Sequence, residues 1–294
     1  MPGSAAASGA EPDPSFPVVA RVIVTILGSG SSGNAILVES GDTRLLVDAG
    51  FSGVDLERRL ASVEIPPESI DALFITHDHT DHTRGMGVLA RRWRIPLYLT
   101  ERTRIACRSM LRGDELVATY SSRDPVRVGP LEISPFLTVH DAVDPVAVTV
   151  SEAETGEKLG VATDLGRPTT TVRSALRGCD MLVLEANYDD LMLRASIYPW
   201  SVKARIASSH GHLSNRASAE LATELAHPGL ACVILAHLSE RANDPGLAEE
   251  VVGTALRSVR FRGEMHTGRQ DVPLPPIDVS RVKRKLMPEQ LALL

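Results

Sequence analysis

The chain has 294 residues, of which 43% are hydrophobic and 23% charged, a mixture that excludes a wholly disordered or fibrous protein. Its formal net charge of -6 supplies no global basic field, so a nucleic-acid partner would have to meet a local basic patch. The three cysteines, Cys107, Cys179 and Cys232, are scattered along the sequence, which excludes a disulfide framework and favours a cytoplasmic location. The apolar runs are too short to span a bilayer, so we predict no membrane partner.

The first half of the chain alternates strand and helix patterns after a leader. Residues 1–20 are rich in Ala, Pro, Ser and Gly and predict a disordered leader. From Arg21 onward, short β-type runs predict strands and amphipathic stretches predict helices. In chain order, the strands are expected at 22–27, 34–40, 43–50, 71–76 and 97–99, and the helices at 54–63, 86–94 and 101–112. Thr100 is the expected N-cap of the last of these helices.

The second half begins with a β-rich stretch and then alternates with helices. Helices are expected at 216–226 and 247–258, with a strand at 232–237 between them. Strands that meander first and alternate with helices later predict two packed sheets under outer helices. This is an α/β fold with a four-layer αββα arrangement, expected over residues 21–267. Residues 268–294 are Pro-rich and basic and are predicted to form a C-terminal tail.

A glycine motif near the start imitates a nucleotide-binding fingerprint. Gly28, Gly30 and Gly33 follow a predicted strand with the G-x-G-x-x-G spacing. The fingerprint requires its last glycine to open a helix whose N-terminus holds pyrophosphate. Here the segment after Gly33 is β-patterned, which predicts a hairpin. We therefore exclude nucleotide binding at this loop.

The most specific signal is the block His77-Asp78-His79-Thr80-Asp81-His82, which directly follows an apolar strand. In an extended segment, residues i and i+2 point the same way, so His77 and His79 can bind one ion together. A turn into a helix would then present Asp81 and His82 to a second ion. Imidazole and carboxylate ligands suit zinc, manganese or iron. A solvated polar loop is the alternative, and four ligand-type residues in six positions disfavour it.

Three further ligand-type residues follow apolar runs at strand ends, namely His140, Asp164 and His237. Each is weak evidence alone, because polar residues at strand ends commonly complete turns. Together they complete a site for two divalent ions, Zn²⁺ or Mn²⁺. We predict that three histidines hold the first ion, that three residues hold the second, and that one aspartate bridges both: His77, His79 and His140; Asp81, His82 and His237; and Asp164.

In order and type these residues resemble the metallo-β-lactamase-fold hydrolases, a superfamily whose pattern matches roughly residues 22–265. The matching elements also include Asp48 in the segment LLVDAG. The resemblance implies an αββα sandwich with metals at one edge, in loops that join strand ends. It also implies that Asp48 is a buried support for the metal loops rather than a ligand.

A second cluster bears on the reaction, because the superfamily hydrolyses lactams, thioesters, lactones and phosphodiesters and the fold does not choose among them. Glu185 lies at a strand end, and His212 precedes a helix for which Asn215 is the expected cap. The pair resembles that of phosphodiesterases such as tRNA 3′-processing nucleases, in which a glutamate orients a histidine that protonates the leaving oxygen. Imidazole titrates near neutrality and a carboxylate fixes its tautomer, so the chemistry is sound. His212 and Glu185 are therefore the predicted catalytic residues, and the role of His210 stays open.

A finer resemblance is to the YycJ (WalJ)-like branch, whose members are described as DNA exonucleases. Seven segments agree in order, among them GSGSSGNAILVE, LEANYD and GHLSN. The segment 240–244 departs from the branch, which tends to have paired asparagines where this chain keeps only Asn243. Asp164 and His237 are 73 positions apart (237 minus 164), too few for the large extra domain of the RNA-cleaving β-CASP nucleases.

The function expected from these features is that of a dinuclear metal-dependent phosphodiesterase, favoured as a 5′-to-3′ DNA exonuclease. A metal-bridging hydroxide would attack the phosphate, and His212 would protonate the leaving oxygen. One alternative is a thioesterase or lactonase of the same fold, which needs no leaving-group acid. Another is a non-catalytic metal-binding module that docks a partner.

A basic stretch is consistent with a nucleic-acid substrate. Residues 84–112 contain eight arginines against one acid, Glu101, a balance of +7 (8 minus 1). Arg104, Arg108 and Arg112 are four apart and are expected on one helix face, and a solvated arginine face is the alternative. Two aromatic side chains of the region are expected to pack against the core rather than stack on bases: Trp93 and Tyr98.

Overall fold

The structure, a computed structural model, describes residues 21–286. The predicted leader at 1–20 and residues 287–294 of the predicted tail lie outside the described residues. None of the helices in residues 21–286 has the length and apolar character that crossing a membrane requires.

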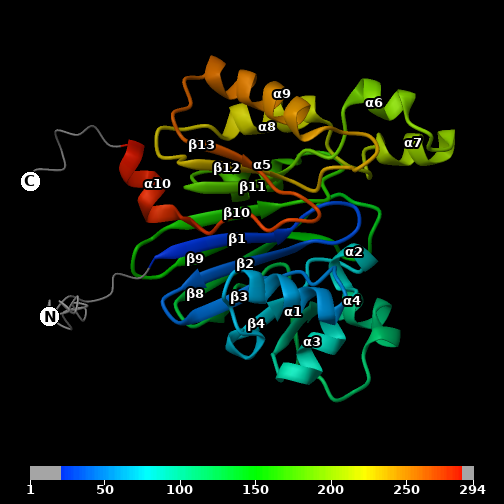
Figure 1. The fold of residues 1–294 in the computed structure, drawn as a ribbon, viewed down its shortest axis with the longest axis vertical. Helices are drawn as coiled ribbons and strands as arrows, with labels where there is room; N and C mark the ends of the chain where they lie inside the picture. The colour runs from blue at the N-terminus through cyan, green and yellow to red at the C-terminus, as the bar shows by residue number, and fades with distance from the viewer. Residues whose placement is uncertain (1–20, 287–294) are drawn as a thin grey trace, which may run out of the picture.

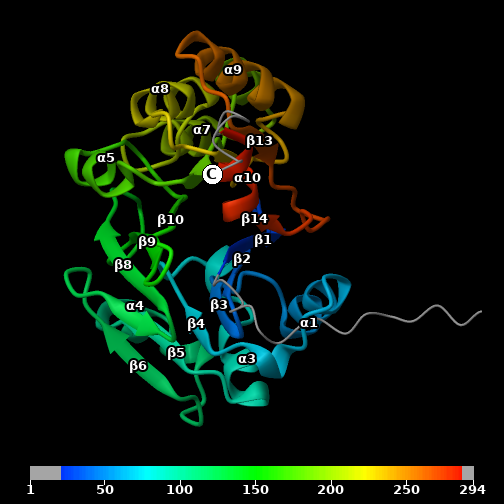
Figure 2. The same cartoon turned by 90° about the vertical axis from the view of Figure 1, so that its left-hand side faces the viewer.

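Two seven-stranded sheets pack face to face (Figures 1 and 2). The first has the order β14-β1-β2-β3-β4-β5-β6 and the second β13-β12-β11-β10-β9-β8-β7. The strands of the first sheet are β1 (Val22–Gly28), β2 (Ala35–Ser40), β3 (Thr43–Val47), β4 (Ala72–Phe74), β5 (Leu97–Thr100), β6 (Val117–Tyr120) and β14 (Ile277–Asp278). Those of the second are β7 (Val126–Val128), β8 (Leu131–Leu137), β9 (Val146–Glu152), β10 (Lys158–Ala162), β11 (Met181–Glu185), β12 (Cys232–Ala236) and β13 (Glu264–Thr267).

Helices cover the outer face of each sheet, which confirms the predicted four-layer αββα arrangement (Figure 2). The first sheet carries α1 (Gly53–Ser62), α3 (Met86–Trp93) and α4 (Glu101–Ala106), with the 3-10 turns η1 (Pro67–Ser69) and η2 (Arg108–Met110). The second carries α5 (Thr170–Leu176), α8 (Asn215–Leu225) and α9 (Pro245–Ser258). Three short helices lie toward one edge of the sandwich, and one closes the described chain: α2 (Thr80–Thr83), α6 (Asp190–Ala195), α7 (Trp200–Ile206) and α10 (Val279–Leu286).

The core consists of three layers of side chains that follow from strand alternation. In β3, Leu45 and Val47 face the interior between the sheets, whereas Leu46 faces the helices outside. Between the sheets, the rings of Phe74 and Tyr120 stack with centroids 4.3 Å apart. Strands buried on both faces read as continuous apolar runs, which is why the sequence marks them so clearly.

Two local predictions are wrong. The helix expected at 101–112 ends at Ala106, because buried Cys107 accepts the tighter i to i+3 bond from the amide of Met110 at 2.9 Å. The three arginines spaced four apart therefore do not share one helix face. The cap of α8 is Ser214, whose hydroxyl accepts from the Ala217 amide, and not Asn215.

Other local predictions are confirmed. The hydroxyl of Thr100 accepts from the Thr103 amide and caps α4. The strands β1 and β2 pair antiparallel around the glycine loop, so the motif is a hairpin rather than a dinucleotide fingerprint. Trp93 packs against the helix layer of the first sheet, and Tyr98 packs against the core between the sheets.

The described part of the C-terminal segment takes part in the fold. In β14, Ile277 pairs with Val24 of β1. Val279 and Val282 of α10 are buried in the core between the sheets, and Ser280 donates to Glu157 at 2.6 Å. Residues 277–282 therefore contribute core contacts even though they lie between a Pro-rich segment and a basic one.

This packing can be tested by introducing a charge into α10. We expect Val282→Asp to lower the free energy of unfolding by about 2–4 kcal/mol, because an unpaired carboxylate would be buried between the sheets. The matched change Arg284→Asp, at an exposed position of the same helix, should alter it by about 0.5 kcal/mol or less. Urea unfolding followed by circular dichroism measures both, and equal effects would contradict the docking of α10.

Candidate metal centre and active site

The predicted site residues all lie at one edge of the sandwich. Asp48 follows β3, and the His-Asp block follows β4, which runs parallel to β3. In the second sheet, Asp164 follows β10, Glu185 ends β11 and His237 follows β12, and these three strands are also parallel. The carboxyl ends of both sets of strands therefore meet at the edge where α2 and α7 lie (Figure 1).

The first group consists of three histidines. His77, His79 and His140 each offer a ring nitrogen, and these atoms lie within 4.8 Å of one another. The Nδ1 atom of His79 is 3.3 Å from Nε2 of His140. Nε2 of His77 is buried and has no hydrogen-bond partner within residues 21–286. Three converging imidazoles, one with an orphaned buried nitrogen, fit a divalent ion such as zinc.

The second group lies beside the first. Asp81, His82 and His237 also offer atoms within 4.8 Å of one another. Oδ2 of Asp81 is 3.2 Å from Nε2 of His237 and 3.5 Å from Nε2 of His82. This carboxylate and two imidazoles form a second ligand set of the type that divalent transition metals accept.

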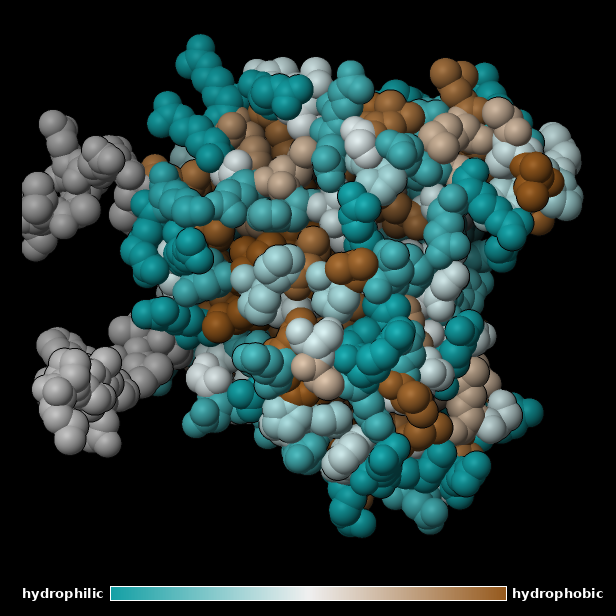
Figure 3. Space-filling view, viewed as in Figure 1, coloured by the Kyte–Doolittle hydropathy of each residue, from teal (hydrophilic) through white to brown (hydrophobic). Residues whose placement is uncertain are grey.

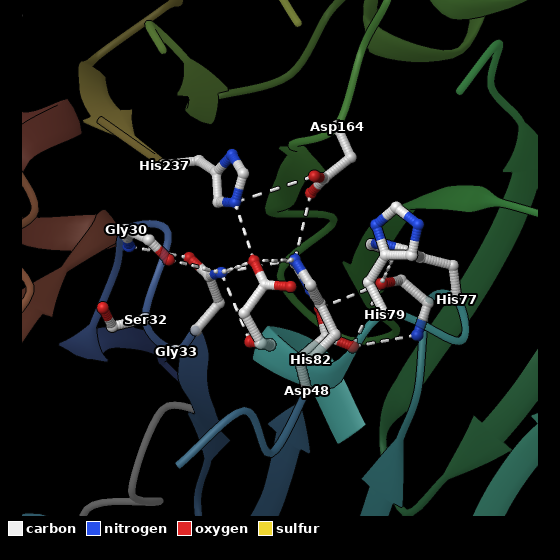
Figure 4. Close-up of polar contacts among 12 residues, drawn as sticks. Gly30, Ser32, Gly33, Asp48, His77, His79, His82, Asp164 and His237 are labelled. Atoms are coloured by element: carbon white, nitrogen blue, oxygen red, sulfur yellow. Dashed lines mark hydrogen bonds and ion pairs between the residues drawn. The ribbon is translucent and has the colours of Figure 1, made fainter. Parts of the chain in front are cut away.

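Asp164 lies between the two groups (Figure 4). Its Oδ2 is 3.2 Å from Nε2 of His82, and its Oδ1 is 3.5 Å from Nε2 of His140. Oδ1 is also 3.6 Å from Nε2 of His237. One carboxylate thus faces both sets of imidazoles, which is the position that a bridging ligand requires.

In each ligand-type histidine, the nitrogen that points away from the cluster has a partner. These contacts are His77 Nδ1 to Thr76 Oγ1 (3.0 Å), His79 Nε2 to the Asp141 carbonyl (3.2 Å), His82 Nδ1 to Asp48 (2.7 Å), His140 Nδ1 to the Gly211 carbonyl (2.9 Å) and His237 Nδ1 to Glu185 (3.0 Å). Such outer contacts fix the tautomer and orient the ring. The five rings are therefore held so that one chosen nitrogen of each faces the cluster.

Asp48 supports both groups at once. Its carboxylate accepts from the amide and the hydroxyl of Thr76 and from Nδ1 of His82. Because the Thr76 hydroxyl donates to Asp48, it is free to accept from Nδ1 of His77. One buried carboxylate thus orients a histidine from each group, and it offers no atom to the cluster itself.

The electrostatics of the cluster are set by buried carboxylates. Burial lowers the pKa of His237, but the carboxylates of Asp164, Asp81 and Glu185 raise it to about 10. Burial likewise lowers the pKa of His82, and Asp164 and Asp48 raise it well above its usual value. Carboxylates that favour a cationic imidazole also favour a bound cation, for which protons compete.

The backbone is strained where the strands end. Asp48, Asp164 and His237 all have positive φ, at 63°, 59° and 56°. This left-handed conformation is uncommon outside glycine, and its occurrence at three strand ends marks a functional edge. Gly50 serves the same edge, because a Cβ there would lie 1.6 Å from the Asp81 carbonyl oxygen.

Glu185 and His212 form a second arrangement at the same edge. Oε1 of the fully buried Glu185 is 2.8 Å from Nδ1 of His212 and 3.0 Å from Nδ1 of His237. Oε2 accepts from the amides of Leu165 and Leu213. Burial raises the pKa of Glu185, but His212 and His237 lower it to about 2. The carboxylate is therefore ionised, and it directs Nε2 of His212 away from itself.

His210 lies apart from the cluster. It is exposed, its carbonyl accepts from the Asp141 amide at 2.9 Å, and its Nδ1 contacts Ser209. The neighbouring Gly211 has no room for a side chain, because a Cβ would lie 2.2 Å from the carbonyl oxygens of Arg205 and Ile206. The contacts of His210 stabilise the conformation of this loop and do not reach the cluster.

Several asparagines at the edge escape the sequence prediction. The side-chain nitrogen of Asn34, in the glycine loop that Figure 4 shows beside the cluster, is 3.4 Å from Asp81 Oδ2. Asn187 donates to the His237 carbonyl at 2.7 Å. Asn215 and Asn243 exchange two amide hydrogen bonds of 2.8 Å. Asn34, Asn187 and Asn215 lie in segments that resemble the YycJ (WalJ)-like branch, and Asn243 lies in the segment 240–244 that departs from it. That resemblance is the sequence signal that could have identified all four.

Three arginines of the basic stretch are paired with acids, two of which, Glu57 and Glu115, lie outside the stretch. Arg91 pairs with Glu115, Arg92 pairs with Glu57 at 3.1 Å, and Arg104 pairs with Glu101 at 2.7 Å. The balance of +7 counted along the sequence therefore overstates the free positive charge of this surface.

Comparison with known proteins bears on the family. Residues 43–237 match the family described as the beta-lactamase superfamily domain. The chain belongs to this superfamily. It is 33% identical over 239 residues to exodeoxyribonuclease YycJ of Bacillus anthracis, a match that covers 81% of this chain and 90% of the relative. It is 35% identical over 231 residues to exodeoxyribonuclease WalJ of Streptococcus pneumoniae, covering 76% and 84%. The predicted resemblance is thereby confirmed.

Solved structures agree on the fold. The metallo-beta-lactamase fold protein YhfI from Bacillus subtilis superposes with a TM-score of 0.68 at 19% identity, over 86% of this chain and 99% of that one. The short form of human tRNase Z has a TM-score of 0.60 at 17% identity, over 86% and 98%. The family, the named relatives and the His-Asp cluster together identify the protein as a metal-dependent hydrolase that binds divalent metal.

The support given by Asp48 generates a prediction about metal affinity. We expect Asp48→Asn to weaken the binding of zinc or manganese about 10–100-fold, because an amide has a single acceptor oxygen and cannot accept both from Nδ1 of His82 and from Thr76, which orients His77. Competition with a chromogenic chelator measures the affinity. Asp71→Asn is the matched control, since Asp71 is exposed and its side chain accepts, among residues 21–286, from the Arg44 amide alone. An unchanged affinity in Asp48→Asn would contradict this role.

Proposed function

We propose that this hydrolase is a dinuclear phosphodiesterase that acts as a 5′-to-3′ exonuclease on DNA. Two relatives that match most of the chain are named exodeoxyribonucleases, which supports a DNA substrate. The residues proposed for the first ion are His77, His79 and His140. Those proposed for the second are Asp81, His82 and His237, with Asp164 between the two.

The observation that carries the phosphodiesterase proposal is the contact of 2.8 Å between Glu185 and Nδ1 of His212. Hydrolysis of a phosphodiester expels an alkoxide, which needs a proton as the bond to phosphorus breaks. The side chain of His212 is 17% exposed, and its Nδ1 lies 3.8 Å from Oδ1 of Asp164. Because Nδ1 faces Glu185, Nε2 is the ring nitrogen that is left to donate a proton to a substrate bound at this edge.

Each residue then has a distinct task. Two divalent ions at such a site supply a water of lowered pKa and neutralise the charge of the scissile phosphate. Glu185 keeps the Nδ1 proton of His212 in place, so that Nε2 is the atom that gives and regains a proton. Asp48 fixes the tautomer of His82 directly and that of His77 through Thr76, and Glu185 fixes that of His237.

The two rival functions fit less well. A thioesterase expels a stable thiolate that needs no leaving-group acid, so His212 would have no proton to deliver there and Glu185 would serve only to orient His237. A lactonase is disfavoured by the two relatives that are named exodeoxyribonucleases. A non-catalytic docking module has no need of two adjacent ligand sets joined by Asp164. The acid pair and the double site both favour the phosphodiesterase.

A cytoplasmic location is part of the proposal. Cys107, Cys179 and Cys232 are all buried and unpaired, as suits a reducing compartment. Burial, the largest influence in each case, raises the pKa of Cys179 and Cys232 to about 12. These thiols are structural rather than reactive.

Removing the acid should separate metal binding from turnover. We expect His212→Ala to keep the metal content of the wild type and to lose about 10²–10⁴ in turnover on DNA. The loss should shrink on a p-nitrophenyl phosphodiester, whose leaving group needs no proton. His77→Ala should instead lose bound metal, as measured by inductively coupled plasma mass spectrometry. An equal loss on both substrates would remove His212 from the proposed role.

The proposed substrate and polarity are tested with end-labelled nucleic acids. Duplex DNA, single-stranded DNA and RNA, each labelled at the 5′ or the 3′ end, are incubated with zinc or manganese. The proposal predicts early release of the 5′ label from DNA as a short product. Faster cleavage of RNA, early release of the 3′ label, or faster turnover of a thioester or lactone would each contradict it.

A further inference from the structure

The most exposed hydrophobic side chains of the described residues outside α1 gather on α6, α7 and the segment between them. Leu191 is 72% exposed, Ile197 84% and Trp200 82%. Figure 3 shows hydrophobic side chains at the upper right, over these two helices. We call residues 190–207 the α6–α7 surface. A large aromatic side chain left in solvent among exposed aliphatic ones marks an interaction surface.

The surface is hollowed and basic. A cavity of about 450 Å³ is lined by Arg194, Tyr198, Trp200 and Lys203, among others. The Nζ atom of Lys203 donates to the Arg194 carbonyl at 2.5 Å, which holds the two helices together. The guanidinium of Arg241 lies over the Tyr198 ring, 5.8 Å from its centroid. An aromatic surface framed by arginine and lysine is complementary to a polyanion that carries flat bases.

Few acids oppose this charge. Asp190, the acid that lines the cavity, lies 3.8 Å from Arg216 of α8. Arg205, on the same helix as Trp200, is 63% exposed and pairs with Asp141 at 3.2 Å. In a chain of net charge -6, such a local excess of cations around an exposed tryptophan favours a nucleic acid over an uncharged partner.

The surface is continuous with the site. The Ile206 carbonyl, at the end of α7, accepts from the His212 amide at 2.9 Å. Asp141, the partner of Arg205, also presents its carbonyl to His79 at 3.2 Å. Trp200 and Ile206 are six residues apart, about 9 Å along a helix axis at 1.5 Å per residue. This length corresponds to two or three stacked nucleotides at about 3.4 Å each.

We propose that the α6–α7 surface binds the unpaired end of the DNA strand that enters the site, with a base stacked on Trp200 and phosphates beside Arg205 and Arg194. The proposal rests on the proposed nuclease function and adds the element that holds the substrate next to the metal centre. Stacking on an aromatic ring tolerates any base, so the contact adds affinity for the strand without sequence preference.

The chain's two tryptophans allow a direct test. In the metal-loaded His212→Ala protein, which turns the substrate over slowly, Trp93→Phe leaves Trp200 as the only tryptophan of the chain and Trp200→Phe leaves Trp93, so excitation at the red edge of the tryptophan band reports on one site at a time. Trp93 is a matched control because its indole is part-buried and donates to Glu57 at 3.0 Å. An oligothymidylate of eight nucleotides should quench the fluorescence of the protein that keeps Trp200 and not that of the protein that keeps Trp93.

Affinity supplies a second readout. Trp200→Ala should bind the fluorescently labelled oligothymidylate about tenfold more weakly than Trp93→Phe, the loss expected for one stacked base. An abasic oligomer of the same length should bind the Trp93→Phe protein about as weakly and without quenching. Equal affinities for the two variants, or equal quenching by the abasic oligomer, would overturn the proposal.

A second copy of this chain is the competing occupant of the surface. A dimer in sedimentation that Trp200→Ala dissociates, without quenching by the oligomer, would overturn the proposal in its favour. The quenching experiment and the nuclease assay test the two proposals separately. Degradation of DNA by the wild type without quenching refutes the strand surface alone, whereas quenching without degradation refutes the nuclease function alone.

Discussion

Every histidine at the edge must present one particular ring nitrogen, and this constraint governs the rest of the structure. Two buried carboxylates impose it on four of the rings, and the backbone carbonyls of Asp141 and Gly211 impose it on His79 and His140. Asp48 reaches His82 directly and His77 through the Thr76 hydroxyl, so it orients one ring from each group. Glu185 reaches His237 and His212 with a single oxygen. The proposed metal ligand and the proposed acid therefore share one support, and a change at Glu185 acts on both.

The two supports stand on the two packed sheets. Asp48 comes from the first sheet and Glu185 from the second, so the stacked sheets determine the distance between the two ends of the site. The left-handed backbone at Asp48, Asp164 and His237 is held by this framework, as strained conformations at functional sites generally are. The interior packing, including the stacked rings of Phe74 and Tyr120, thus determines where the imidazoles point.

Much of this could be predicted from the sequence, for a physical reason. Strands buried on both faces leave continuous apolar runs, and ligand-type residues placed at their ends stand out, so the fold and the seven-residue cluster were both accessible. Contacts that depend on chain turns were not. The arginines at 104, 108 and 112 lost their common face when the helix ended at Ala106, and the exposure of Trp200 could not be predicted because a tryptophan next to a few apolar residues packs against a core as readily as it faces solvent.

In the proposed mechanism, Glu185 orients His212 and His212 delivers a proton to the leaving oxygen. A series of thymidine phosphodiesters with aryl leaving groups of graded pKa tests it most directly, in the wild type and in Glu185→Gln at matched metal content. The rate of the wild type should depend weakly on the leaving-group pKa, because the acid supplies the proton, and the rate of Glu185→Gln should fall steeply as that pKa rises. Identical dependence in the two proteins would contradict the account.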